Sequence, residues 1–166
     1  LDVAGYHPAR PKPLLGELYR RYIPELNAAL TLEGLDVDKH LIFFNKWQNS
    51  QRVANFWDQT GSLEEHRQYL EESVKNNKNQ LLVVCLDNQP FAYIEVYWTK
   101  EDRIAPYYSA GDYDRGIHML VGEESHRGAH KVAAWLPSVC HFIYLSDPRT
   151  EKIVSEPRAD NDKMIG

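Results

Sequence analysis

The sequence predicts an α/β or α+β domain built on a mixed sheet, and three observations carry this prediction. The chain has 166 residues, which is long enough for one domain with its own core. Hydrophobic residues make up 43% and charged residues 26%, as in ordinary globular proteins. Segments with the 3.6-residue period of helices are interspersed with segments that have the two-residue period of strands.

The first third of the chain predicts an arm, a helix, a strand and a second helix. Residues 1–13 contain three prolines and no periodicity, which indicates an irregular arm. Leu14–Ile23 spaces its apolar residues as a helix does. Ala28–Leu35 alternates apolar and polar residues and predicts a strand. Asp36 then offers an N-cap for a helix that runs to about Trp47.

The middle of the chain predicts a well-capped helix followed by a hairpin. Ser62 and, three residues later, Glu65 form a capping box, which marks the start of a helix. The period then changes to that of strands, over Leu81–Leu86 and Phe91–Trp98. The turn residues at 87–89 join these two strands, so we expect a β-hairpin.

The last third predicts a strand, a helix and a short final strand. Arg115–Gly122 has strand character, and a helix is expected from near Arg127 to the early 140s. Pro137 falls inside that helix and must kink or split it. Lys152–Ser155 is expected to form the last strand.

Net charge, apolar runs and cysteine content indicate which kinds of partner the protein has and in which cellular compartment it resides. The net charge of −5 argues against a nucleic-acid partner. No apolar run approaches the roughly 18 residues that a membrane span needs, and no secretory signal is visible, so we expect a cytoplasmic protein without a membrane partner. Cys85 and Cys140 lie far apart in apolar surroundings and are expected to be buried thiols in a reducing compartment.

The segment Asp114–Lys131 joins a strand to a helix through a turn of small and basic residues. Such a turn lets backbone N–H groups face a ligand, and the helix N-terminus adds partial positive charge. Arg127, Lys131 and two histidines concentrate cationic side chains there in an otherwise acidic chain. This pattern favours a phosphate or pyrophosphate ligand. The alternative is a surface turn whose basic residues offset Glu123 and Glu124.

This strand, turn and helix resemble the coenzyme A unit of the GNAT acyltransferase superfamily. The family turn is written Q/R-x-x-G-x-G/A, whereas Arg127-Gly128-Ala129-His130-Lys131 has one glycine in place of two. Four longer phrases, together with that turn, resemble the acyltransferases of hydroxamate siderophore assembly: Lys46–Trp57, Phe91–Trp98, Glu101–Tyr108 and Asp114–Gly122. The resemblance covers residues 14–166 and implies one acyl-CoA acyltransferase domain, with a mostly antiparallel central sheet flanked by helices.

The resemblance also implies a reaction. Acetyl-CoA or another acyl-CoA would acylate an N-hydroxylated amine, such as N6-hydroxylysine or a hydroxylated putrescine or cadaverine, to a hydroxamate. A siderophore synthetase, fused or separate, is an expected partner. The related enzymes continue past the equivalent of Glu156–Asn161 through a helix and a final hairpin, so we expect this chain to be truncated.

The residues expected to act in catalysis are His118 and Asp160. An amine attacking a thioester must lose a proton, and histidine is poised to accept one near neutral pH. The family resemblance places a histidine in this strand position as the base, and a carboxylate after the Glu156-Pro157 turn that orients it or holds the substrate. The structural alternatives are a packed histidine for His118 and a helix cap for Asp160, and Asp162 could take the place of Asp160.

The expected binding residues form two groups. The cofactor group follows the strand and the turn, together with one asparagine expected to contact the cofactor: Leu120, Val121, Arg127, Gly128, Ala129, His130, Lys131 and Asn161. The substrate group supplies aromatic faces and polar atoms for an amine: Trp47, Asn49, Trp57, Glu95, Tyr97 and Trp98. Core packing is the alternative for each aromatic residue, and exposure on the outer face is the alternative for Glu95.

Two other function classes stay open. An aminoglycoside-type N-acetyltransferase shares the tryptophan–asparagine opening of the Lys46–Trp57 phrase. A non-catalytic acyl-CoA-binding domain of a larger synthetase is the second alternative. We expect no metal, because His126, His130 and His141 have Arg and Lys for companions in place of further ligands.

Overall fold

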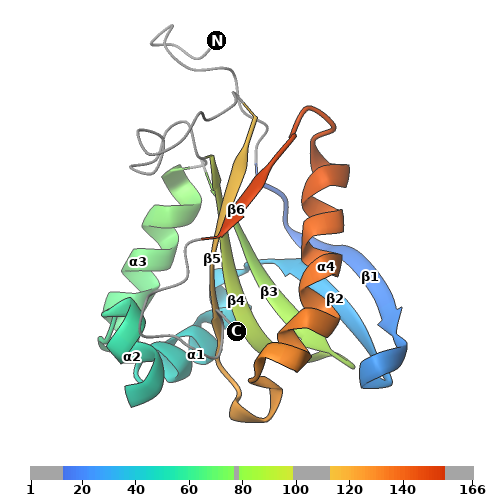
Figure 1. Ribbon diagram of the computed structural model, residues 1–166. Coiled ribbons are helices and arrows are strands. Elements are labelled where there is room, and N and C mark those ends of the chain that lie inside the picture. Colours follow the sequence, from blue (N-terminus) through green and yellow to red (C-terminus); the bar gives the residue numbers. More distant parts are fainter. Residues whose placement is uncertain (1–12, 77–78, 99–112, 156–166) are drawn as a thin grey trace, which may run out of the picture.

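The fold is a six-stranded mixed sheet with helices on both faces (Figure 1). The computed structural model describes residues 13–76, 79–98 and 113–155. Neighbouring strands pair antiparallel from β1 to β5, and β6 pairs parallel with β5, which confirms the predicted mixed and mostly antiparallel sheet. In sheet order the strands are β1 (Gly16–Ile23), β2 (Ala28–Gly34), β3 (Gln80–Leu86), β4 (Gln89–Trp98), β5 (Arg115–Val121) and β6 (Ile153–Ser155).

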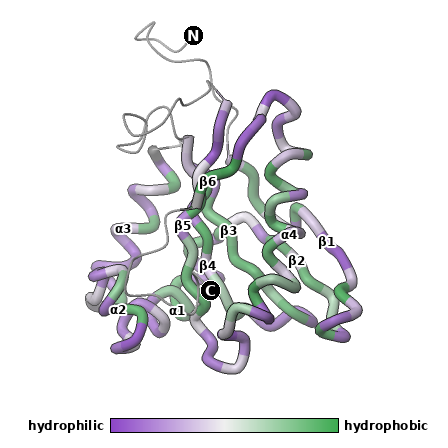
Figure 2. The backbone as a smooth tube through the Cα atoms, in the orientation of Figure 1, coloured by the Kyte–Doolittle hydropathy of each residue, from purple (hydrophilic) through white to green (hydrophobic). Residues whose placement is uncertain are grey.

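Helices cover the two faces of the sheet unequally. Among the described residues, one face carries a single long helix and the other carries three consecutive helices (Figure 1). Figure 2 shows hydrophobic residues along the strands between these layers and hydrophilic residues on the outer helix surfaces. The single helix is α4 (Ala129–Ser146), and the three opposite it are α1 (Val37–Gln48), α2 (Gln51–Trp57) and α3 (Leu63–Asn76).

Alternating strand side chains create a separate core on each face. Under α4, Leu30, Leu82 and Ile94 pack against Trp135. Under α1–α3, side chains of the opposite parity on the strands form the second core with residues of these helices, namely Phe44, Trp47, Val53, Leu70, Val83, Tyr93 and Leu120. The α1–α3 face is the one that carries the candidate site.

The predicted helix starts at Asp36 and Ser62 are confirmed. The Asp36 carboxylate accepts hydrogen bonds from the N–H groups of Asp38 and Lys39. At the second start, Glu65 N–H donates to Ser62 Oγ over 3.1 Å, and Ser62 N–H donates to Glu65 Oε1 over 3.2 Å, which is a complete capping box. The predicted hairpin of β3 and β4 is confirmed as well.

The predicted helix over Leu14–Ile23 is wrong, because this segment forms β1. A register shift between Glu17 and Tyr19 places a bulge in the strand. As a result Leu18 and Tyr19, which are adjacent in sequence, both pack against the core under α4. The bulge breaks the two-residue alternation of a strand and produces the spacing that imitated a helix.

Three smaller expectations also have outcomes. α4 continues through Pro137 as one helix and is not split there. Cys85 is buried, as predicted, whereas Cys140 is only half-buried; both are free thiols. Within the described residues, no helix is long and apolar enough to cross a membrane.

Candidate active site

His118 lies directly opposite Glu95 in the register of β5 and β4. Glu95 follows Tyr93 by two residues, so both side chains point to the α1–α3 face. His118 Nδ1 lies 3.9 Å from Glu95 Oε1. The His118 side chain is 34% exposed and the Glu95 side chain 13%, so the imidazole reaches the surface and the carboxylate lies beneath it.

Aromatic rings flank the imidazole of His118. The centroid of the Tyr97 ring lies 4.5 Å from that of the imidazole, with the planes tilted by 36°. Trp57, at the end of α2, approaches edge-on at 6.5 Å. The predicted substrate residues Trp57, Glu95 and Tyr97 are therefore brought together around His118.

Gly116 allows the Tyr97 ring to lie in this position. The two residues are register partners on β5 and β4. A Cβ on Gly116 would lie 2.2 Å from the Tyr97 ring, far inside van der Waals contact. The glycine therefore lets the ring cross β5 and contact the histidine two residues along the strand.

Two tyrosines, which the sequence analysis did not single out, hold Glu95. Tyr69 on α3 donates its hydroxyl to Glu95 Oε2 over 2.9 Å, and Tyr93 on β4 donates to the same oxygen over 2.7 Å. Burial raises the pKa of both phenols well above the ordinary value, and the charge of Glu95 raises it further. Both hydroxyls therefore stay protonated and donate to the carboxylate at neutral pH.

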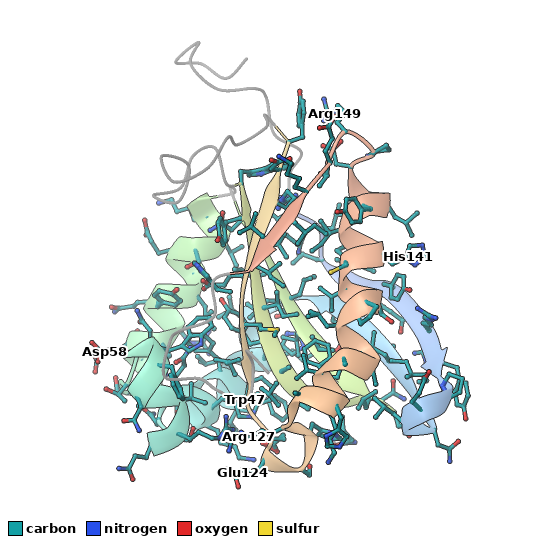
Figure 3. All side chains as sticks on the ribbon, in the orientation of Figure 1. Trp47, Asp58, Glu124, Arg127, His141 and Arg149 are labelled. Atoms are coloured by element: carbon teal, nitrogen blue, oxygen red, sulfur yellow. The ribbon has the colours of Figure 1, made fainter. Side chains whose placement is uncertain are left out.

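The turn after β5 carries cations and exposes a helix start. Gly128 caps α4 with φ +116°, a conformation that favours glycine, and no side chain of the cap accepts from the first helical N–H groups. Arg127 pairs with Glu124 over 3.3 Å, and Lys131 donates to the Ser125 carbonyl. Figure 3 shows Glu124 and Arg127 together at this turn, with Arg149 at the opposite end of α4.

Arg52 adds a further cation to the turn and was not assigned a role from the sequence. It comes from α2 and donates to the Val121 carbonyl over 2.8 Å and pairs with Glu124 over 3.3 Å. Burial lowers the pKa of Arg52, and the nearby positive charge of Arg127 lowers it further. Its position within the Lys46–Trp57 phrase was the available signal, because that phrase forms the α1–α2 corner facing the turn.

Trp47 and Asn49 serve local structure. The Trp47 side chain is 1% exposed, and its indole N–H donates to Glu123 Oε2 over 3.0 Å, which anchors the turn to α1. Asn49 exchanges two hydrogen bonds with the backbone of Gly61, at 2.8 and 2.9 Å, and so closes the loop between α2 and α3. These contacts do not bring either residue to His118.

Trp98 points away from His118. It is adjacent to Tyr97 on β4, so its side chain lies on the opposite face of the sheet. The Arg115 guanidinium stacks 3.6 Å from its ring centroid and also donates to the carbonyls of Val96 and Tyr97. Trp98 therefore belongs to a buried cation–π contact at the start of β5.

The other predicted cofactor residues continue from β5 into α4. Leu120 and Val121 are buried on opposite faces of the strand, whereas Ala129 and His130 are exposed in the first turn of the helix. Asp160 and Asn161 lie outside the described residues. Within the described chain, β5 and β6 pair only from Arg115 to Ile117.

The arrangement suits an elongated substrate. Gly122 follows His118 by four positions, so His118 and the turn are about 13 Å apart along the strand at the usual rise of about 3.3 Å per residue. An imidazole thus lies at one end of the strand segment and a turn rich in cationic side chains at the other. The described residues hold no group of three or more His, Cys, Asp or Glu side chains that could bind a metal ion.

The mostly antiparallel sheet, whose fifth strand leads through the Gly128 turn into α4, has the arrangement that the resemblance to the GNAT superfamily implies. Residues 36–166 match the family model described as the acetyltransferase (GNAT) domain. The chain belongs to this family, which confirms the predicted superfamily.

Two curated relatives are named as acyltransferases of hydroxylated amino acids. The chain is 43% identical over 160 residues to the N(6)-hydroxylysine O-acetyltransferase of Escherichia coli, with 96% of this chain and 51% of that protein covered. It is 44% identical over 159 residues to the N(5)-hydroxyornithine:cis-anhydromevalonyl coenzyme A-N(5)-transacylase of Beauveria bassiana, covering 93% of this chain and 35% of that protein. The chain thus spans about half, or less, of these relatives. The predicted resemblance to this branch is confirmed.

Solved structures support the fold. An uncharacterized protein from Bacillus halodurans superposes with a TM-score of 0.82 at 27% identity, covering 91% of this chain and 77% of that one. The aminoglycoside acetyltransferase AAC(6')-Ib in complex with coenzyme A superposes with a TM-score of 0.69 at 20% identity, covering 82% of this chain and 79% of that one.

Proposed function

We propose that residues 14–166 form an acyl-CoA-dependent acyltransferase domain that acylates an N-hydroxylated amine to a hydroxamate. The observation that carries this proposal is the position of His118. It lies among aromatic rings, over a buried carboxylate, on the strand that leads into the cationic turn. Relatives named for hydroxylysine and hydroxyornithine support the substrate class.

The turn after β5 would hold the pyrophosphate of an acyl-CoA. Gly128 leaves the first N–H groups of α4 without a side-chain cap, and those groups are natural donors to phosphate oxygens. Arg127, Lys131 and Arg52 would supply charge, and the exposed Ala129 and His130 would border the phosphates. The backbone of Leu120 and Val121 would line the path along which the coenzyme carries the acyl group to His118. Asn161 is a further proposed contact of the coenzyme.

The proposed reaction transfers the acyl group directly. The amine nitrogen attacks the thioester carbonyl, so a C–N bond forms and the C–S bond breaks. His118 accepts the proton from the nitrogen, and the departing thiolate takes up a proton to become the thiol. Placing both reactants along one strand contributes much of the rate through proximity.

An N-hydroxylated amine fits the site better than an aminoglycoside. Trp57 and Tyr97 flank the imidazole with apolar ring faces, which suit the methylene chain of a linear amine. Likeness to the aminoglycoside enzyme is at the level of fold, at 20% identity, whereas the hydroxylamine-type relatives reach 43–44%. A non-catalytic acyl-CoA-binding domain would give no reason for a surface histidine over a buried carboxylate.

The test pairs acetyl-CoA and succinyl-CoA with hydroxylysine, hydroxyputrescine, hydroxycadaverine and kanamycin, using the full-length protein. Release of thiol with a hydroxylated amine, and not with kanamycin, is the expected result. Addition of ferric iron then separates the products, because a hydroxamate chelates the metal and colours the solution whereas an O-acyl product does not. Absence of thiol release with every pair would reject the proposal.

The proposed reaction has two further implications. Acyl-CoA donors are cytoplasmic metabolites, so we propose a cytoplasmic location. A hydroxamate product is one building block of a larger iron chelator, so an enzyme that condenses such blocks, fused or separate, is the proposed partner.

A further inference from the structure

The carboxylate of Glu95 is fixed by two elements at once. Tyr69 comes from α3 and Tyr93 from β4, and both hydroxyls donate to Oε2. Two donors on one oxygen prevent rotation of the carboxylate and leave the other oxygen, Oε1, facing His118 at 3.9 Å. The two tyrosine hydroxyls thus hold the Glu95 carboxylate, and the carboxylate in turn faces the imidazole of His118.

We propose that Glu95 is the positioning residue for His118 in the reaction proposed above, on which this inference rests. Glu95 Oε1 accepts the proton on Nδ1, which fixes the neutral tautomer with its lone pair on Nε2. The proton from the amine then adds to Nε2, and the Nδ1 proton stays in place. The carboxylate charge stabilises the resulting imidazolium. Glu95 therefore takes the orienting role that the sequence suggested for Asp160.

Burial separates this role from direct substrate binding. The Glu95 side chain is less exposed than His118, at 13% against 34%, so the imidazole lies between the carboxylate and the surface. One carboxylate oxygen is already occupied by two phenols, and the other faces Nδ1. The distance of 3.9 Å must shorten by about 1 Å to form a hydrogen bond, as is common when a site closes on its substrate.

The tyrosines make a Glu95→Gln variant unusually informative. The two hydroxyls remain donors, so they hold the amide oxygen where Oε2 lies and direct the amide NH₂ toward His118. An NH₂ group cannot accept from Nδ1–H, so the imidazole is driven to the opposite tautomer, with its proton on Nε2. The base is then blocked while the size and packing of the side chain are retained.

The first measurement is the tautomer itself, by long-range ¹H–¹⁵N NMR of the His118 ring in the full-length protein above pH 7.5. Wild type should show the Nδ1–H tautomer, and Glu95→Gln the Nε2–H tautomer. A Tyr69→Phe/Tyr93→Phe variant should show a mixture, because the carboxylate is no longer fixed. Glu72→Gln, the same change at an exposed position of α3, is the matched control and should match wild type. Identical tautomers in wild type and Glu95→Gln would overturn the proposal.

The second measurement is steady-state kinetics on the preferred acyl-CoA and hydroxylated amine. Glu95→Gln should lower kcat by about 10²-fold or more with KM for the amine nearly unchanged, the size of effect expected when a base is disabled. A raised KM with unchanged kcat would assign Glu95 to substrate binding and overturn the positioning role. If the wild type turns over no hydroxylated amine, the reaction proposal fails, and the tautomer measurement still decides the part that Glu95 plays.

Discussion

His40 and His118 differ in burial, and this difference gives them different roles. His40 is 2% exposed, accepts a hydrogen bond from Asp36 N–H at Nδ1, and has Nε2 3.7 Å from Glu33. His118 is one-third exposed and faces a region bordered by aromatic rings. His40 therefore stabilises the corner between β2 and α1, whereas the partly exposed His118 is placed to act in the proposed reaction.

Replacing His118 with Ala should lower kcat by about 10²–10⁴-fold, because the proton acceptor is lost. Steady-state thiol release measures the effect. His141→Ala is the control, since His141 is an exposed histidine on α4 whose Nδ1 bonds the Tyr19 hydroxyl on the other face of the sheet. An unchanged kcat in His118→Ala would favour the non-catalytic acyl-CoA-binding alternative.

His40 should make the stability of the fold depend on pH. Burial lowers the pKa of His40 below its ordinary value of 6.5, despite the opposing charge of Glu33. The unfolded chain then binds the proton more readily, so the stabilisation is complete above about pH 6.5 and is lost as the pH falls below it. The free energy of unfolding should decrease by up to about 1.4 kcal/mol per pH unit in that range.

Urea unfolding between pH 5 and 8 tests this dependence. A His40→Gln variant should lack the contribution of this group, while it keeps Glu33, Asp36 and Lys39, the charged groups that face the imidazole, in place. His141→Gln should keep the slope of wild type. Equal slopes in His40→Gln and wild type would show that the buried imidazole is not the group responsible.

At the scale of elements, the pairing of β4 with β5 positions the site. Gly116 and Tyr97 are opposite each other, as are His118 and Glu95. Gly116→Ala should force the Tyr97 ring away from the imidazole, cost about 1–3 kcal/mol through overpacking, and lower kcat. Chemical denaturation and thiol release measure the two effects.

A double variant separates crowding from other consequences of that change. Gly116→Ala/Tyr97→Ala removes the ring that the new methyl group meets. Its loss of stability should be clearly smaller than the sum of the two single losses, because the two residues are in contact. Additive losses would mean that the close approach is relieved without moving Tyr97.

The elements that the sequence predicted are those set by local contacts. Asp36 and Ser62 cap their own helices, so their signals lie within three residues. β1 depends on pairing with β2 and contains a bulge. The periodicity of apolar residues in the sequence reveals neither feature. The hydrogen bond that holds Glu95 beside His118 comes from Tyr69, which is 26 residues away in the sequence. This contact forms only once α3 has packed on the sheet, so the local sequence does not reveal it. The short helix α2 was missed because seven residues give little periodicity.

At the scale of the whole molecule, bound coenzyme A should stabilise the fold, since it would connect β5, α2 and α4. At a concentration of 100 times Kd, a ligand specific to the folded state adds about 2.7 kcal/mol, or about 5–10 °C in Tm for a chain of this size. Differential scanning fluorimetry with coenzyme A measures the shift.

Variants of the turn after β5 test whether the rise in Tm comes from coenzyme A bound at that turn. Arg127→Ala/Lys131→Ala should lose most of it, because the phosphates lose two cationic partners. Lys75→Ala, an exposed lysine on α3, is the control and should retain the full shift. A full shift in the turn variant would place the coenzyme elsewhere.

The outer strand β1 has a consequence for the behaviour of the protein in concentrated solution. An unpaired strand edge is a template on which a second copy can extend the sheet. Here the bulge between Glu17 and Tyr19 interrupts the regular spacing of the backbone groups, and the exposed Arg21 adds positive charge, whereas Arg20 is paired with Glu17 over 2.7 Å. Among the described strands β1 lies at the edge of the sheet, and its bulge puts two such edges out of step, so we expect β1 to be a poor template for sheet extension by a second copy.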